Sequence, residues 1–345
     1  VRKMLDKSLY TTVLCQTFSP CGKCLVAGNN YMIGLLSSEY NKPKYLHTLE
    51  DSRQIYSLAT TKNFLIVGTD KEILGWDWKN VVSEKISKPS WAIKVATGDF
   101  PHEQYDVNSM WLSDDEEKLY AGCGDHMLYG YDLENGKKLS TYQGHTDYLH
   151  CIHGKENQIV SAGEDGCVFI WDTRTGRSCN IVEPHKNTKL SRPDIGKWIG
   201  AAALGGDWFV CGGGPRAALY HLRSLDATTI FDIPNRGIHV ASFNDDCVVL
   251  GGVTKHLYQM SYAGETKVEL PVTATTTYSV LMRTSPNKIL SIAGSSPYID
   301  LCTSFMYRDQ VLNFRYVVSD HPERETVVMI LYFYCIRTRK ANIYV

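Results

Sequence analysis

Residues 144–172 contain the stretch that decides the fold. They begin Gly144-His145-Thr146-Asp147, continue after an apolar segment with Ile159-Val160-Ser161-Ala162-Gly163-Glu164-Asp165-Gly166, and end Val168-Phe169-Ile170-Trp171-Asp172. Short β-branched and aromatic runs are separated here by residues that favour turns. The Asp165-Gly166 pair between two such runs is typical of a tight turn that joins antiparallel strands. The stretch therefore predicts part of an antiparallel sheet.

Weaker copies of this pattern lie within residues 13–36, 54–78, 107–132, 198–222, 238–260 and 278–315. The 307 residues from Tyr10 to Tyr316, shared among seven units, give about 44 residues per unit, and a four-stranded propeller blade needs about 40–45. We predict an all-β chain with a single domain, a seven-bladed β-propeller over residues 10–316. Residues 1–9 would form an N-terminal segment whose true start could lie upstream, because the first methionine is Met4.

The 144–172 unit resembles the WD-repeat family, in which each unit supplies one blade. The Gly-His start and the Trp-Asp end carry the resemblance, and of the other units only 54–78 ends in Trp-Asp, at Trp76-Asp77. The resemblance implies that four side chains form a hydrogen-bonded network, which stiffens a blade when every member is satisfied. These are His145, Ser161, Asp165 and Trp171.

Composition limits the class of protein. The net charge of −1 argues against a surface that grips phosphates throughout, although it leaves room for a local basic patch. The 11 cysteines are scattered and odd in number, which favours reduced thiols in the cytosol or nucleus over a disulfide framework. We expect no membrane-spanning helix, because no run of about 18 apolar residues occurs. No secretory signal pattern occurs at the start of the chain.

Two groups of potential metal ligands have structural explanations that we prefer. Cys21 and Cys24 have the spacing of half a zinc site, but a structural zinc needs four ligands and no second Cys-x-x-Cys follows. We expect a turn residue and a strand residue there. His150, Cys151 and His153 follow His145 on one extended strand, where successive side chains point to opposite faces, so we expect no metal site.

The glycine run Gly212-Gly213-Gly214-Pro215 lacks the Lys and the Ser or Thr of a phosphate-binding loop. We expect a turn whose glycines adopt positive φ angles. No nucleophile elbow, His-Glu-x-x-His or dinucleotide-binding pattern is present. We therefore predict a protein that is not an enzyme and that carries no cofactor and no metal.

Two long connections are candidates for binding, with a solvated loop as the alternative for each. Residues 79–106 are neutral overall, and we expect Trp91 and Phe100 to pack back on the ring. Residues 183–197 carry a net charge of +2 and could contact RNA or an acidic partner, although we favour a solvated loop. The basic residues of this loop are Lys186, Lys189, Arg192 and Lys197.

The tail, residues 317–345, contains ten consecutive apolar residues, Val327–Ile336, which is about half the length needed to cross a bilayer. The segment is β-prone and uncharged, so it would promote aggregation if exposed. It could be a partner-binding strand, an alternative transcript end or a disordered segment. We favour a C-terminus outside the family pattern with no designed role.

Longer stretches resemble a family of WD-repeat subunits of the THO complex. The matching segments are Phe18–Lys23, Ala27–Tyr31, Gly144–Tyr148, Ser191–Pro193, Gly196–Gly200, Asp207–Trp208, Val210–Pro215 and His221–Ser224. The resemblance implies a nuclear, non-catalytic scaffold in the transcription–export assembly, which acts in mRNA processing, splicing and export. Its partners would be the coiled-coil THO subunits, with indirect or weak RNA contact and no membrane. Near the blade turns, we expect partner-binding residues at Asp147, Tyr148 and Glu164.

A second hypothesis rests on residues 171–174, which read Trp-Asp-Thr-Arg. This box resembles that of WD-repeat substrate receptors of cullin-RING ubiquitin ligases, and Arg174 would be the exposed contact to the ligase adaptor. Arg forms good bidentate anchors at interfaces. Much of the box is also what any regular blade of this family contains, so we rank this hypothesis second. A propeller enzyme is the third and weakest alternative.

Overall fold

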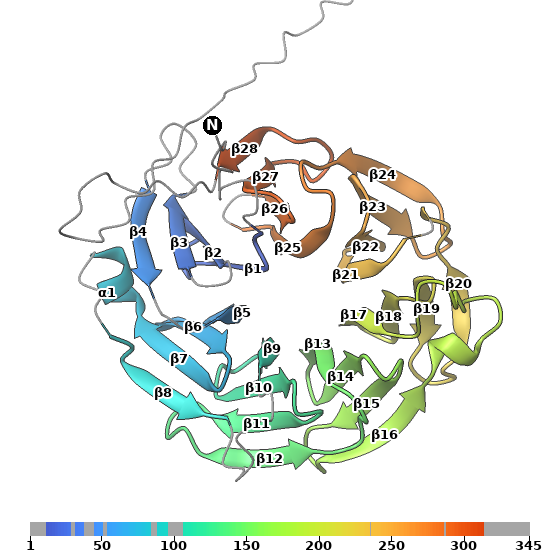
Figure 1. Cartoon of the computed structure of the whole chain (residues 1–345), viewed down its shortest axis with the longest axis horizontal. Helices are drawn as coiled ribbons and strands as arrows, with labels where there is room; N and C mark the ends of the chain where they lie inside the picture. Colours follow the sequence, from blue (N-terminus) through green and yellow to red (C-terminus); the bar gives the residue numbers. More distant parts are fainter. Residues whose placement is uncertain are drawn as a thin grey trace, which may run out of the picture.

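The computed structural model describes residues 12–28, 32–37, 45–50, 54–83, 88–95, 106–234, 236–285 and 288–313. Within these ranges the chain forms seven four-stranded antiparallel sheets, each built from four strands in sequence order. The sheets follow one another around a ring with a central opening (Figure 1). The predicted all-β propeller is confirmed, and its seven sheets follow the predicted repeat units.

We number the sheets as blades one to seven in chain order. Blade one contains β1 (Cys15–Phe18), β2 (Cys24–Gly28), β3 (Met32–Ser37) and β4 (Tyr45–Glu50); blade two contains β5 (Ile55–Thr60), β6 (Phe64–Thr69), β7 (Glu72–Asp77) and β8 (Trp91–Lys94); blade three contains β9 (Val107–Leu112), β10 (Lys118–Cys123), β11 (Leu128–Asp132) and β12 (Lys138–Tyr142). Blade four contains β13 (Leu149–Lys155), β14 (Gln158–Gly163), β15 (Val168–Asp172) and β16 (Arg177–Val182); blade five contains β17 (Ile199–Gly205), β18 (Trp208–Gly213), β19 (Ala218–His221) and β20 (Ala227–Ile230). Blade six contains β21 (Ile238–Asn244), β22 (Cys247–Gly252), β23 (His256–Ser261) and β24 (Thr266–Pro271); blade seven contains β25 (Thr277–Arg283), β26 (Ile289–Gly294), β27 (Tyr298–Cys302) and β28 (Gln310–Asn313).

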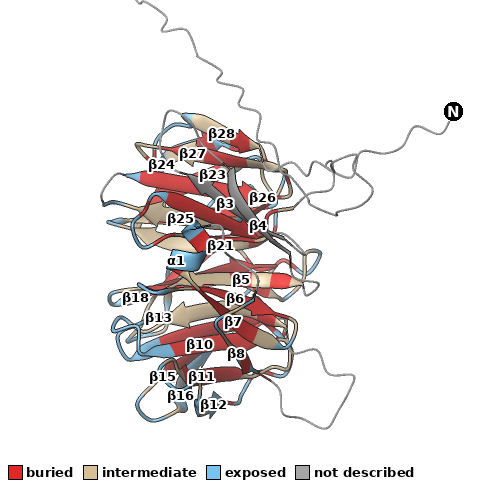
Figure 2. Cartoon of the chain, turned by 90° about the vertical axis from the view of Figure 1, so that its left-hand side faces the viewer, coloured by how far each residue is buried: buried red, intermediate tan, exposed pale blue. Residues whose placement is uncertain are grey.

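The hydrophobic core lies between neighbouring blades. The second strand of a blade is covered on both faces, so it is mostly apolar, as in β14, where every residue from Ile159 to Gly163 is buried and Ser161 is the one polar side chain among them. Val160 and Ile170 of blade four share one buried cluster with Leu204 and Phe209 of blade five. Figure 2 shows buried residues along the strands and exposed residues mainly in the turns at the two ends of the blades.

Contacts between blades seven and one close the ring. The Val13 backbone N–H donates to Gly294 O at 2.9 Å, and the Ser291 hydroxyl donates to the side-chain oxygen of Gln16. The Arg283 guanidinium lies 4.8 Å from the centre of the Phe18 ring. Hydrogen bonds and a cation–π contact therefore join the first and last blades.

The prediction that residues 79–106 form a long connection between blades is wrong in part. This segment contains most of α1 (Trp78–Val82) and also β8, which is the fourth strand of blade two. The reason is that Trp76-Asp77 ends the third strand, β7, and not the blade. Trp91 packs edge-on against Phe64 at 5.8 Å, as predicted, whereas Phe100 lies outside the described residues.

The 183–197 connection begins with a short 3-10 helix, η2 (Pro184–Lys186), and buries Leu190 before it reaches blade five. The N-terminal segment 1–9 and the tail 317–345 both lie outside the described residues. Across the described ranges, no helix has the length and apolar character needed to span a membrane.

Candidate functional site

His145 and Asp165 of the network and three of the four predicted partner-binding residues lie at one end of blade four, whereas Ser161 and Trp171 lie farther along β14 and β15. The segment before β13 carries His145, Asp147 and Tyr148, and the turn between β14 and β15 carries Glu164 and Asp165. Pairing of Leu149 with Gly163 places this segment beside this turn. We call this end of the blade the His145 end.

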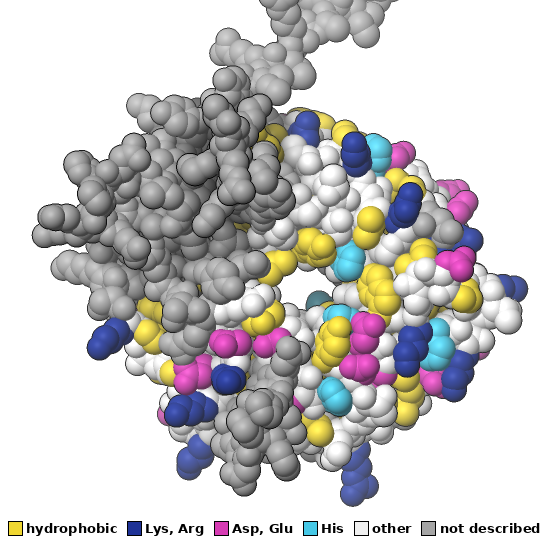
Figure 3. Space-filling model, in the orientation of Figure 1, with side chains coloured by type: hydrophobic (Ala, Val, Ile, Leu, Met, Phe, Trp, Pro, Cys, Tyr) yellow, Lys and Arg dark blue, Asp and Glu magenta, His cyan; other side chains and the backbone are white. Residues whose placement is uncertain are grey.

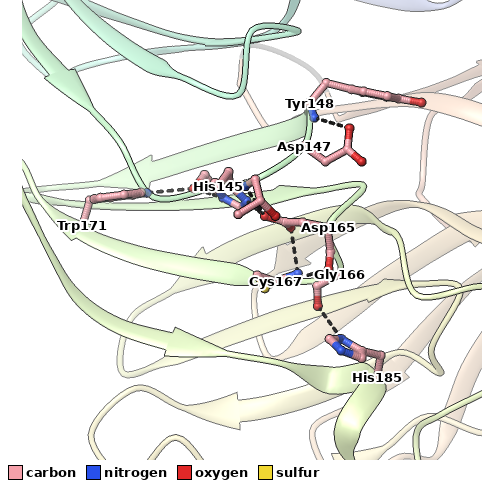
Figure 4. Close-up of polar contacts among 10 residues, drawn as sticks. His145, Asp147, Tyr148, Asp165, Gly166, Cys167, Trp171 and His185 are labelled. Carbon is pink, nitrogen blue, oxygen red and sulfur yellow. Dashed lines mark hydrogen bonds and ion pairs between the residues drawn. The ribbon is translucent and has the colours of Figure 1, made fainter.

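The hydrogen bonds expected among the four network residues are present (Figure 4). His145 Nδ1 lies 2.8 Å from Asp165 Oδ2, and His145 Nε2 lies 2.8 Å from Ser161 Oγ. The Trp171 indole N–H donates to the same hydroxyl at 2.7 Å. The Trp171 ring also stacks on Phe169, with ring centres 5.2 Å apart and planes inclined by 10°.

These contacts assign one consistent proton arrangement. The Asp165 carboxylate can only accept, so it accepts from His145 Nδ1–H; with a neutral imidazole, Nε2 then accepts from the Ser161 O–H, whose oxygen accepts from Trp171. Burial raises the pKa of Asp165, but hydrogen bonds from His145 and from the Cys167 N–H outweigh it and hold this pKa below its usual value. His145 is 6% exposed, and Ser161 is completely buried with its hydroxyl oxygen bonded to both His145 and Trp171, so this network stabilises the blade from within.

The four predicted partner-binding residues do not form one site. Tyr148 is 40% exposed, and Figure 4 shows its ring directed away from the network. Glu164 lies beside it, 2.8 Å from the imidazole of His150. Arg174 lies in the turn between β15 and β16, at the opposite end of the blade, where both Asp172 oxygens accept from its guanidinium at 3.0 and 2.6 Å.

The predicted basic loop needs one correction, at Arg192. This side chain is buried, and its guanidinium donates to the carbonyl oxygens of Gly214 at 2.6 Å and of Gly213 and Pro215 at 3.0 Å. Arg192 therefore anchors the loop to blade five and is not a surface cation. The exposed cations of the loop are Lys186, which pairs with Glu183 at 2.8 Å, Lys189 and Lys197.

The glycine run 212–215 is also different from the prediction. Gly212 and Gly213 end strand β18, and none of the three glycines has a positive φ. Glycine is required at two of these positions because the backbone of a neighbouring segment approaches closely. A Cβ at Gly213 would lie 2.2 Å from Trp198 O, and a Cβ at Gly214 would lie 2.1 Å from Gly196 O. The same close packing presents the carbonyls that bind Arg192.

The cysteine and histidine groups have the structural places expected for them. Cys21 lies in an exposed turn, and Cys24 is the buried first residue of β2. His153 Nδ1 accepts the Leu204 N–H at 3.2 Å, which joins blades four and five. Burial, with a smaller contribution from Lys155, lowers the pKa of His153 to about 4.

A set of ring contacts that the sequence does not reveal crosses four blades. Successive ring centres are 5.1 Å apart between Tyr148 and His150, 6.2 Å to Trp198, 5.0 Å to His239 and 5.2 Å to Tyr278. We call these five residues the aromatic arc. In the sequence, each of the five is next to the first residue of the first strand of its blade, but this shared place does not show that the rings meet.

Comparison with known proteins agrees with this architecture. The family model described as "WD domain, G-beta repeat" matches residues 136–172, which include the whole network. THO complex subunit 6 of Drosophila melanogaster is 39% identical over 313 residues, covering 88% of this chain and 89% of that protein. The Danio rerio homolog is 33% identical, with 89% and 98% covered, and the Homo sapiens protein is 35% identical, with 89% and 94% covered. The chain therefore belongs to the THO complex subunit 6 family of WD-repeat proteins.

Proposed function

We propose that this protein is a non-catalytic scaffold subunit of the nuclear THO complex, within the transcription–export assembly. In this role it acts in mRNA processing, splicing and export through protein–protein contacts, with the coiled-coil THO subunits as partners. The observation that carries the proposal is similarity along 88–89% of the chain to relatives that bear the name THO complex subunit 6. We further propose that residues 10–316 act as one domain.

The described polar groups support a scaffold over a catalyst. His145 is buried, and the Ser161 hydroxyl to which it is bonded is completely buried and also bonded to Trp171. His153 is likewise bonded between blades four and five. A rigid ring of this kind can present turns at both ends of every blade to partners.

Electrostatics favour protein contact over direct RNA contact. The chain has a net charge of −1, and the 183–197 loop has one surface cation fewer than its composition suggests, because Arg192 is buried against backbone carbonyls. Lys186 is paired with Glu183. Any RNA contact of this loop would therefore be weak or indirect.

Affinity purification of the tagged full chain from nuclear extract, with quantitative mass spectrometry, tests the proposal. We expect the other THO subunits to be enriched together over an untagged control. If they stay at the control level, the proposed membership of the THO complex is wrong.

One observation keeps the ligase hypothesis as a second candidate. The Arg174 side chain is 69% exposed, and Asp172 holds it in a fixed, outward position. If a cullin adaptor were enriched in the same experiment, the Arg174→Ala variant would abolish the enrichment, whereas the nearby exposed Arg177→Ala control would keep it. Enrichment of an adaptor that survives Arg174→Ala would contradict this second candidate.

A further inference from the structure

The aromatic arc follows the inner edge of blades four to seven. His150, His239 and Tyr278 are each the second residue of the strand that lines the central opening, at a β-bulge. The remaining blade of this series, blade five, has Gly200 at the equivalent position. Figure 3 shows hydrophobic and histidine side chains around the opening on this side of the ring.

Two glycines make room for the largest ring of the arc. A Cβ at Gly200 would lie 2.7 Å from the Trp198 indole, and one at Gly237 would lie 2.9 Å from it. The indole N–H donates to Ile195 O at 3.1 Å, which fixes the ring against these glycines. Trp198 therefore fills the position that has no side chain in blade five and makes the arc continuous.

The arc is partly open to solvent. Tyr148 at one end is 40% exposed and Tyr278 at the other is 36% exposed, and Val253, which packs beside Gly237, is 40% exposed. Large apolar side chains that are exposed together, and not singly, mark interaction surfaces. Tyr and Trp are also the residues that most often dominate binding energy at protein interfaces.

The charges at the Tyr148 end are negative. Glu164 is bonded to His150, and Asp147 precedes Tyr148. Burial and the charges of Glu164 and Asp147 together raise the pKa of Tyr148. Burial, with a smaller effect of His150, lowers the pKa of His239 to about 4, so His239 is neutral at pH 7. Lys197, an exposed cation next to Trp198 in the sequence, has its backbone oxygen and Cβ close to Gly166 in the turn after β14.

A partner must therefore offer apolar surface and positive charge. Two carboxylates beside the exposed ring would repel the phosphates of RNA. An arginine guanidinium can stack on an aromatic ring and pair with a carboxylate at the same time, which lysine does less well. These requirements match a protein segment in which an arginine is flanked by apolar residues.

We propose that the aromatic arc is the docking surface for such an arginine-bearing segment of a partner protein. The arginine stacks on Tyr148 and pairs with Glu164 and Asp147, and the apolar neighbours of that arginine cover Trp198, Val253 and Tyr278. This inference rests on the proposed function, because it assigns one surface through which the scaffold holds a partner.

The test uses the purified full chain and short overlapping peptides that cover the other THO subunits. We expect the binding peptides to contain arginine with apolar neighbours, and arginine-to-alanine versions to lose binding. Tyr148→Ala and Glu164→Gln should each weaken binding by about tenfold, as expected for a loss near 1.4 kcal/mol. The matched controls Tyr307→Ala and Glu134→Gln change exposed residues in turns at the opposite end of the blades and should leave affinity unchanged.

Three results would overturn the inference. Peptide binding could persist in Tyr148→Ala and Glu164→Gln, or no peptide could bind at all. A single-stranded oligouridine could also bind the wild type and lose affinity in Tyr148→Ala, which would make the arc an RNA surface. In each case co-purification of THO subunits with the wild-type chain would show that the proposed function still stands, and its absence would show that both have failed.

Discussion

Trp171 gives the sharpest test of how blade four is held together. The side chain is 2% exposed, stacks on Phe169 and donates its indole N–H to Ser161. Trp171→Ala removes the buried ring and should lower the free energy of unfolding by about 3–5 kcal/mol. Trp171→Phe keeps most of the ring and removes the N–H, so it should cost about 1–2 kcal/mol.

A double-mutant cycle separates the hydrogen bond from packing. Ser161→Ala removes the acceptor of Trp171 and the partner of His145 Nε2, and should cost about 2–4 kcal/mol because a buried imidazole nitrogen loses its bond. In the Ser161→Ala background, Trp171→Phe should cost at least about 0.5 kcal/mol less than in the wild type. Denaturant unfolding curves of the four proteins give these values. Strictly additive costs would refute the coupled network, and an unchanged midpoint for Trp171→Ala would show that Trp171 is not buried.

Three further predictions concern blades four and five. Arg192→Ala leaves three carbonyls without their donor, so it should lower the free energy of unfolding in denaturant by about 2–4 kcal/mol. The control Lys186→Ala should change the free energy of unfolding by less than about 0.5 kcal/mol. Equal losses in the two variants would contradict the anchor role of Arg192. Gly213→Ala places a Cβ 2.2 Å from Trp198 O, so its melting temperature should fall clearly, and a wild-type value would show that no close approach exists. His153 has a folded pKa of about 4 and an unfolded value near 6.5, so the unfolded chain binds the proton first and stability should decrease as pH falls from 6.5 to about 4. Thermal melts across this range should show a shallower decrease for His153→Gln, and an identical decrease would exclude His153 as its source.

The propeller and the network could be predicted because their signals are local and repeated. His145, Ser161, Asp165 and Trp171 fall within 27 residues of one unit, and the repeat spacing alone indicates the number of blades. The fourth strand of each blade is harder to locate from the sequence than the inner strands, because it lies at the circumference of the ring and contains fewer buried apolar residues. In β12, for example, Lys138, Leu139 and Thr141 are exposed. For the same reason the sequence of β8 indicates a connection and not a strand.

Arg192 and the aromatic arc could not be predicted, since both depend on segments that meet only in the folded ring. An arginine in a basic stretch indicates a solvated loop, and only the close approach of Gly213–Pro215 reveals three carbonyls that bind it. The arc joins residues from Tyr148 to Tyr278. Their contacts depend on the bulged register at the start of β13, β21 and β25, which no single unit of sequence specifies.

Co-expression with the other THO subunits, followed by size-exclusion chromatography with light scattering, tests the central claim most directly. A scaffold subunit should elute in a stoichiometric complex of much greater mass than its own 38.9 kDa. The same chain carrying Trp171→Ala should enter this complex less efficiently, because the propeller is less stable. Elution of the folded wild-type chain alone at its own mass, with the remaining subunits assembled without it, would contradict the account.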